Sequence, residues 1–478
     1  MSDPKIIQGG MGIGVSTYNL ARTVSSLGYV GTVSGTCAEL VMVRNLQLGD
    51  LKGDWRRALS HFPIPEMAER VLRKYFIENG KSAEAGFSNV PMFTIKPSTP
   101  LIELTVCASF AQVWLAKESH NGLVAVNLMT KLPMPMVYNI FGCMLAGVDY
   151  ILIGAGIPMQ IPSVLDSLEK METAIYQLDV LGAKKGDIYQ MVFDPKSIVG
   201  DKIKSLKRPK FVPIITSHIL AISMLKRLPG KIYGWIIERK DAGGHNAPPR
   251  GKVEMGSDGL IIYGPRDEPD LNRIRDLGLP FWLAGSFVSL EGIHNVFESG
   301  AVGIQAGTIF ALSSESGFNE IYKRELRRLA FRGELKVYDD ILASPTGFPF
   351  KVAHLPGSLS GDEEYGNRPR VCNIGHLRQL FLEKDGSIGY RCPAEPIDIF
   401  ISKGGLPDEA IGRKCLCNAL AANIDLRQLQ ARTGYVEKPL ITLGRDYEFI
   451  RYLMKSEDNS YLAYQAILYL ESLFERAK

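Results

Sequence analysis

Cysteines, long apolar runs and blocks of like charge are all scarce in this chain. Its 478 residues include only seven cysteines, too few for a disulfide-stabilised scaffold, so we expect free thiols or metal ligands. No stretch of about 18 uncharged apolar residues occurs, and the first residues lack the basic and apolar segments of a secretory signal. These absences predict a soluble cytoplasmic protein with no role in the membrane.

An excess of one charge is missing as well. Lysine and arginine number 55 and aspartate and glutamate 51, so the net charge is only +4 and gives little support for a nucleic-acid partner. Hydrophobic residues make up 46% of the chain, which is enough for a substantial core. The length exceeds what one core usually spans, so we expect one large domain and a second unit.

Short runs of β-branched residues, each followed by a helical stretch, recur from the first residues to about residue 332. Such alternation is typical of parallel βα units, and eight of them close into a (β/α)₈ TIM barrel, with a doubly wound open sheet as the alternative. Two segments that fit no minimal repeat, residues 50–100 and 169–209, are interpreted as insertions. The eight expected strands are residues 5–8, 31–34, 123–127, 150–153, 211–216, 234–238, 281–284 and 302–305.

The pattern changes after an expected helix at residues 319–332. Several prolines and a turn-rich stretch interrupt residues 333–478, so we divide the chain into a barrel, residues 1–332, and a C-terminal α+β extension. Within the extension, residues 378–391 are expected to form a hairpin. The last helix, residues 461–474, has a broad apolar face that we expect to pack on the barrel, with a second subunit as the alternative.

Small and polar residues close the expected strands, and in a barrel these strand ends form the face that carries active sites. Glycines there let the backbone approach a flat ligand, although a simple tight turn uses them too. The ends of the last two strands are where barrels often bind phosphate through backbone N–H groups, so the loops together predict a pocket for a phosphorylated cofactor. The residues assigned to this pocket are Gln8, Gly9, Gly10, Met11, Asn127, Gly154, Gly156, Gly243, Gly244, Ala284, Gly285, Ser286, Gln305, Gly307 and Thr308.

Two histidines follow expected strands. His245 ends the glycine-rich stretch 241–245, and its imidazole suits a general base or a hydrogen-bond donor to a polarised ligand. The alternative is a ring that only fixes its loop. His218 is a second candidate for lining the pocket, and the other five histidines receive no role.

The order and spacing of these motifs resemble those of the nitronate monooxygenases, formerly called 2-nitropropane dioxygenases. The resemblance extends over roughly residues 1–330, and its most specific element is Ala-Gly-Gly-His at residues 242–245. Flavin-dependent enoyl reductases of fatty-acid and polyketide synthesis are related and share the barrel. The motifs are Gln8-Gly9-Gly10-Met11, Asn127, Gly154-Ala155-Gly156, Ala242-Gly243-Gly244-His245, Ala284-Gly285 and Gly303-x-Gln305-x-Gly307-Thr308.

The resemblance implies FMN over the barrel mouth, with residues 8–11 near the isoalloxazine, Asn127 along the ring and ribityl chain, and the last two strand ends at the phosphate. It also implies that His245 takes the α-proton of a nitroalkane, and that flavin reduced by the bound nitronate reacts with O₂ to give a carbonyl compound and nitrite. Ser286 replaces the second glycine of many members, and residues 246–250 make the histidine loop stiffer.

Two alternatives stay open beside a nitronate monooxygenase. One is an FMN- and NAD(P)H-dependent enoyl reductase acting on an acyl chain, with the extension helping to hold an acyl carrier protein. The other is a flavin-binding assembly protein without catalysis. A barrel of this kind does not by itself decide among these functions. A homo-oligomer is compatible with each of them.

The extension also contains four of the seven cysteines. Four thiols could hold a structural zinc or an iron–sulfur cluster. One C-x-C pair and two single cysteines differ from the paired knuckles of zinc sites, so buried free thiols are the alternative and we assign no metal ligand. The four are Cys372, Cys392, Cys415 and Cys417, whereas core positions are expected for Cys37, Cys107 and Cys143.

Overall fold

Eight parallel strands form a closed barrel in the computed structural model, which describes residues 3–478. Around the barrel the strands follow one another in the order β1-β10-β9-β8-β7-β4-β3-β2. All eight expected strands are confirmed, and the open doubly wound sheet is wrong because β1 pairs with β10. The barrel strands are β1 (Ile6–Gln8), β2 (Val30–Ser34), β3 (Leu123–Met129), β4 (Tyr150–Gly154), β7 (Lys210–Ile215), β8 (Trp235–Glu238), β9 (Phe281–Ala284) and β10 (Gly303–Ala306).

Alternate side chains of these strands fill the inside of the barrel. Ile7, Val30 and Trp282 belong to an apolar cluster that also includes Ala125, Leu152, Val212 and Ile236. Successive side chains of a strand point to opposite faces, so a residue two positions further on also faces the barrel axis, one layer higher. That upper layer is the floor of the barrel mouth, and it includes Asn127, Gly154, Ile214, Glu238, Ala284 and Gln305.

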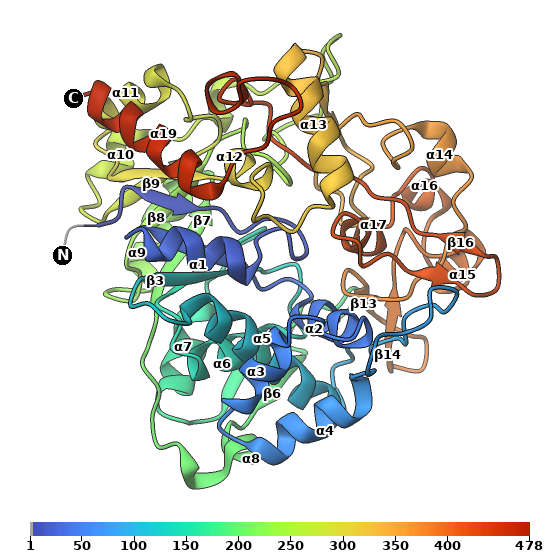
Figure 1. Cartoon of the computed structure of the whole chain (residues 1–478). Coiled ribbons are helices and arrows are strands. Elements are labelled where there is room, and N and C mark those ends of the chain that lie inside the picture. The colour runs from blue at the N-terminus through green and yellow to red at the C-terminus, as the bar shows by residue number, and fades with distance from the viewer. Residues whose placement is uncertain (1–2) are drawn as a thin grey trace.

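Helices connect the strands and cover the outside of the barrel (Figure 1). The longest, α5, is long and apolar enough to cross a membrane, yet 78% of its apolar window is buried, and it packs against five neighbouring helices as a core element. The helices between barrel strands and after β10 are α1 (Tyr18–Ser26), α2 (Ala38–Gln47), α5 (Thr99–Lys117), α6 (Met136–Leu145), α7 (Ile161–Glu169), α9 (His218–Arg227), α10 (Leu271–Arg275), α11 (Leu290–Ser299), α12 (Thr308–Ala311) and α13 (Glu320–Arg332).

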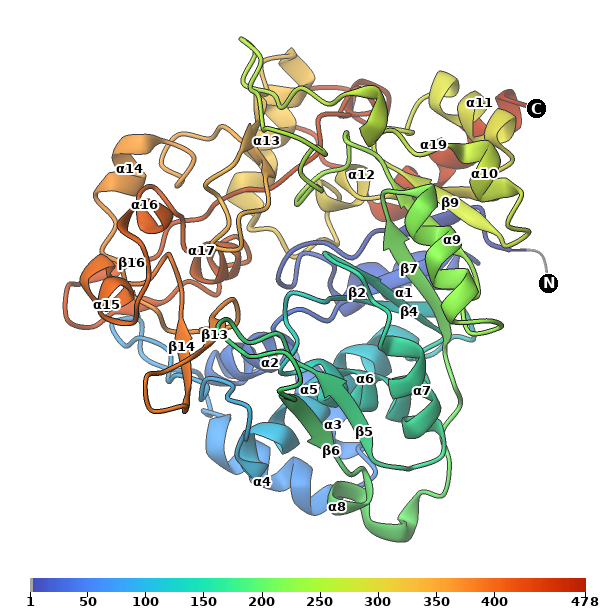
Figure 2. The same ribbon diagram turned by 180° about the vertical axis from the view of Figure 1, so that it is seen from behind.

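Both expected insertions are present between barrel units. The first adds two helices that pack on α5, and the second adds an antiparallel hairpin beside α6 and α7 (Figure 2). A short 3₁₀ turn, η2 (Pro265–Asp267), lies in the long connection after β8. The inserted elements are α3 (Asp54–Ser60), α4 (Pro65–Tyr75), β5 (Ala174–Gln177), β6 (Gln190–Phe193), α8 (Lys196–Val199) and η1 (Gly200–Lys202).

The extension runs across the mouth and returns to the outside of the barrel. His245 forms a bridge with Phe350, and α19 packs on α1 and α11, beside which Figure 1 shows it. The expected packing of the last helix is therefore confirmed. The expected hairpin is confirmed as well, because residues 379–382 pair antiparallel with residues 388–391. The extension consists of β11 (Val337–Asp340), β12 (Phe350–Ala353), α14 (Asp362–Gly366), β13 (Gln379–Leu382), β14 (Ile388–Arg391), α15 (Ile397–Ser402), α16 (Pro407–Ala410), α17 (Leu416–Ala422), β15 (Leu429–Gln430), β16 (Tyr435–Val436), α18 (Ile450–Leu453) and α19 (Ala463–Arg476).

One buried hydrogen bond tests this docking of the extension. The hydroxyl of Tyr461, whose side chain is buried, donates to the carbonyl of Ile309 at 2.6 Å. We predict that Tyr461→Phe lowers the free energy of unfolding by about 1–2 kcal/mol, because a buried carbonyl loses its partner. Thermal and urea unfolding measure the change, with Tyr464→Phe as the control, since Tyr464 is 47% exposed. Equal effects of the two substitutions would contradict the docking.

Candidate functional site

A large pocket opens at the mouth of the barrel, with an empty volume of about 1680 Å³ that includes its open entrance. Most of the residues assigned to a cofactor pocket from the sequence line it. Segments from both ends of the chain meet here, because the extension closes one side. The lining residues that the sequence predicted are Gly9, Gly10, Met11, Asn127, Gly154, Gly243, Gly244, His245, Ala284, Gly285, Ser286, Gln305, Gly307 and Thr308.

Three predicted residues lie outside this lining. Gln8 is fully buried beneath the first loop, where its amide donates to Ser16 Oγ at 2.8 Å and accepts the Thr32 N–H at 2.8 Å. Gly156 follows Gly154 and Ala155, which line the pocket, but is not itself part of the lining. The expectation for His218 is wrong, because it does not line the pocket: it is the first residue of α9, and its Nδ1 accepts the N–H of Asp270 at 3.1 Å.

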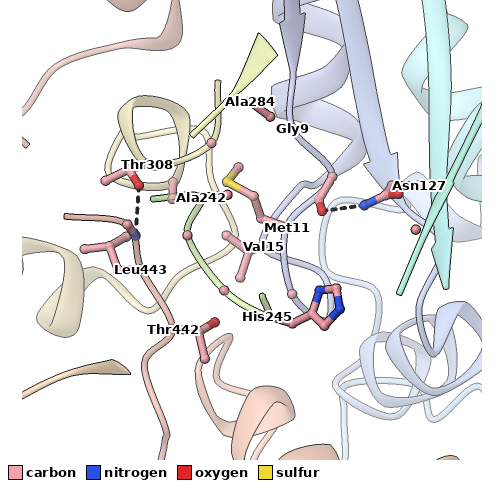
Figure 3. A pocket seen from close by; sticks show the side chains of 18 of the residues that line it. Gly9, Met11, Val15, Asn127, Ala242, His245, Ala284, Thr308, Thr442 and Leu443 are labelled. Carbon is pink, nitrogen blue, oxygen red and sulfur yellow. Dashed lines mark hydrogen bonds between the residues drawn. The ribbon is translucent and has the colours of Figure 1, made fainter. Parts of the chain in front are cut away.

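The first loop is held tightly against the barrel floor. Asn127 Nδ2 donates to the Gly10 carbonyl at 2.8 Å, a bond drawn in Figure 3. A Cβ at Gly10 would stand 2.1 Å from Asn127 Cβ, so this position requires glycine. The second amide atom, Asn127 Oδ1, is buried and has no hydrogen-bond partner among the described residues, and neither has Gln305 Nε2. The floor therefore contains one buried acceptor and one buried donor that the described residues leave unpaired.

His245 lies in the wall of the pocket, on the loop after β8 (Figure 3). Its ring packs against Phe348 and Phe350, with centroids 5.3 and 5.9 Å apart. Burial, with a smaller contribution from the charge of Lys131, lowers the pKa of His245 to about 4. The Lys131 ammonium lies 4.5 Å from the Phe348 ring centroid. At neutral pH the pocket thus holds a neutral imidazole near a positive charge.

Glu238 is a pocket residue that the sequence analysis missed. It ends β8 in the upper layer of the barrel, and burial raises the pKa of its carboxyl to about 7, while the charge of Lys351 opposes this shift. No side-chain hydrogen bond or ion pair to Glu238 occurs within residues 3–478. The signal was the strand itself: alternation places the glutamate that ends Trp235-Ile236-Ile237 on the inner face.

The ends of β9 and β10 form a polar corner of the pocket. Gly285 and Ser286 adopt φ angles of 109° and 59°, and the serine accepts a conformation that favours glycine. The backbone N–H groups of Ser286, Phe287 and Gly307 donate to no other described backbone or side-chain atom. Thr308 Oγ1 accepts the N–H of Gly444 at 3.0 Å, so the extension covers this corner (Figure 3). Free N–H groups at a strand end suit an anion such as phosphate.

The opposite wall also comes from the extension, which sequence reasoning did not assign to the pocket. His376 lines it, and its Nε2 stands 2.6 Å from Glu39 Oε1 in a buried pair. Leu377 and Cys417 lie beside it in the lining. These residues follow no barrel strand, so no spacing in the sequence could place them at the mouth.

Comparisons with known proteins found similarity among solved structures. No family model and no curated protein matches the chain. Similar solved structures include FabK from Thermotoga maritima (16% identity, 99% of this chain and 93% of that chain, TM-score 0.47) and nitroalkane oxidase from Streptomyces ansochromogenes (13%, 99% and 96%, 0.48). A third is the enoyl reductase domain of MlnA from Bacillus amyloliquefaciens (12%, 98% and 95%, 0.49). Such likenesses concern the fold, and the chemistry of the mouth rests on its own residues.

The raised pKa of Glu238 has a consequence for stability. A carboxyl whose pKa is about 7 when folded and 4.5 when unfolded binds its proton more tightly in the folded state, so the protein loses stability as pH rises from about 4.5 to 7. We predict that Glu238→Gln raises the free energy of unfolding at pH 8 by about 1–3 kcal/mol, so that the variant unfolds at a higher temperature than the wild type. At pH 4 we expect no such gain.

Calorimetry across this pH range measures the difference. The exposed Glu254→Gln serves as the matched control, and we expect a pH-independent effect for it. If Glu238→Gln stabilises the protein equally at pH 4 and pH 8, the pKa of the Glu238 carboxyl is not raised in the folded protein, and the prediction is wrong.

Proposed function

We propose that the protein is an FMN-dependent oxidoreductase that acts on alkyl nitronates, with nitroalkanes as their neutral precursors. The observation that carries the proposal is the neutral His245 beside Lys131, in the same pocket as unpaired amide groups and free backbone N–H groups. The ordered strand-end motifs, which resemble those of nitronate monooxygenases, support the same function.

The pocket residues fit FMN. The amides of Asn127 and Gln305, each with one buried unpaired atom, would pair with the polar edge of an isoalloxazine once turned toward the mouth. Gly10 lets the first loop lie close against Asn127. The backbone N–H groups of Ser286 and Gly307 would hold the phosphate. Bound FMN would supply the redox chemistry, taking electrons from the nitronate and passing them to O₂.

Protein groups would handle charge and protons. Because its pKa is about 4, the His245 imidazole is unprotonated at neutral pH and can accept the α-proton of a nitroalkane. The negative charge that then develops on the nitro oxygens would be attracted by His245 in its protonated form and by Lys131, both in a site of low polarity. A nitronate that is already anionic needs no proton transfer, so we expect it to be the better substrate.

Two functions compete with this proposal. In an NAD(P)H-dependent enoyl reductase the same pocket would take an acyl chain, presented by an acyl carrier protein. In an assembly protein it would hold flavin without turnover. The seven unpaired cysteines agree with the cytoplasmic location that we propose.

Anaerobic visible spectroscopy tests the proposal. We expect bleaching of the flavin absorbance on addition of ethyl nitronate, and return of the colour with formation of nitrite when O₂ is admitted. Bleaching by NADPH alone would favour the enoyl reductase. A flavin that neither reagent reduces would favour the assembly protein.

His245→Asn tests the proton acceptor. We predict a loss of turnover with neutral nitroethane of about 10²–10⁴-fold, as for removal of a general base, and a much smaller loss with ethyl nitronate. His218→Asn is the matched control, because His218 also follows a barrel strand but lies outside the pocket. If both substrates are oxidised at unchanged rates by His245→Asn, the assignment of His245 is wrong.

A further inference from the structure

One side of the mouth is lined by a group of apolar side chains. Ile13 and Val15 come from the loop after β1, Phe318 from the segment before α13, and Leu416 and Leu420 from α17. All five side chains are buried, yet they face the empty space of the mouth. We call this part of the mouth the apolar compartment.

The barrel and the extension build the apolar compartment together. The Gly317 N–H donates to the Val15 carbonyl at 2.9 Å, which holds the segment before α13 against the first loop. On the other side, a Cβ at Gly14 would stand 2.7 Å from Ile424 Cδ1, so the chain after α17 packs closely on the same loop. The two leucines of α17 are four residues apart and share one face of that helix. The compartment is therefore formed before any ligand binds.

Charge is absent from this side of the mouth. Within residues 3–478, no lysine or arginine lines the mouth, and its acidic residues are Glu238, Asp241 and Asp446. None of these three belongs to the segments that form the apolar compartment. His376, on the wall formed by the extension, already has Glu39 as its partner. A ligand in the compartment thus meets no cation that could neutralise a carboxylate.

The apolar compartment stays available for a second ligand beside FMN. The groups that we assign to FMN come from the ends of β1, β3, β9 and β10, and none of them belongs to the compartment. Val15 and His245 line the same pocket (Figure 3), so a substrate that reacts beside His245 can extend its remaining atoms along the compartment. Each CH₂ group buried there would strengthen binding about threefold to fourfold.

We propose that the substrate is a nitronate with a long, uncharged alkyl chain, and that the apolar compartment binds this chain. The inference rests on the proposed function, because it names the class of nitronate that the same site takes. Short nitronates leave the compartment empty, and nitronates whose chain ends in a carboxylate would bury an unpaired charge in it.

A series of nitronates of increasing length tests the proposal in the protein supplied with FMN. We expect the KM to fall about threefold to fourfold for each added CH₂ group from ethyl through butyl to hexyl nitronate. The nitronate of 6-nitrohexanoate is the matched control for charge, and its KM should be about tenfold or more above that of hexyl nitronate. Equal KM values for ethyl and hexyl nitronate, or a lower KM for the carboxylate, would overturn the proposal.

A binding measurement reads the apolar compartment without turnover. The neutral fluorescent probe N-phenyl-1-naphthylamine is bound to the same protein and displaced by 1-alkanols, and we expect 1-octanol to act at concentrations about 10²-fold lower than 1-butanol. If alkanols follow this order but no nitronate is oxidised, the proposed function is wrong and the compartment remains. If ethyl nitronate is oxidised but neither series depends on length, this inference is wrong and the proposed function remains.

A substitution in α17 locates the chain. Leu420→Asn places a polar side chain of similar size in the apolar compartment, and we expect the KM for octyl nitronate to rise about tenfold relative to that for ethyl nitronate. Leu468→Asn is the matched control, because Leu468 is 45% exposed on α19, and it should keep the wild-type ratio. An unchanged ratio in a folded Leu420→Asn would overturn the placement of the chain, and the two series on the wild type decide the proposal if this variant does not fold.

Discussion

Pairing of the first barrel strand with the last closes the ring, and every loop of the mouth depends on it. Ile6 pairs with Ile304, and the Gly9 N–H donates to the Ala306 carbonyl at 2.7 Å. This contact brings the glycine loop of β1 next to the polar corner at β9 and β10, although almost the whole barrel sequence separates them. An open sheet would place the same residues at opposite edges, and no common pocket would exist.

Burial then determines the chemistry of the groups at the mouth. The apolar filling of the barrel ends one layer below Glu238, so this carboxyl and His245 both stand where charge is costly. Burial raises the pKa of Glu238 to about 7 and lowers that of His245 to about 4. Lys131 supplies the positive charge nearby. The imidazole is therefore neutral near pH 7, and the extension forms part of the pocket wall beside it.

The barrel and much of its pocket could be predicted because their signals are local. Apolar runs of strand length, closed by glycine, serine or asparagine, predicted all eight strands, and the strand ends identified His245 and most of the lining. Glu238 was within reach through the alternation of its strand. The wall formed by His376 had no local signal, since it depends on how a distant loop folds back. His218 was misplaced because its ring, at the start of α9, bonds to the N–H of Asp270 and does not line the pocket.

The central claim is that the barrel mouth is an FMN site. The most direct measurement is to denature the purified protein, separate the released small molecules by chromatography and quantify flavin per chain. The account predicts about one FMN per chain, either as purified or after incubation with FMN and removal of the excess. Absence of bound flavin in both samples, from a protein that is folded by circular dichroism, would contradict it.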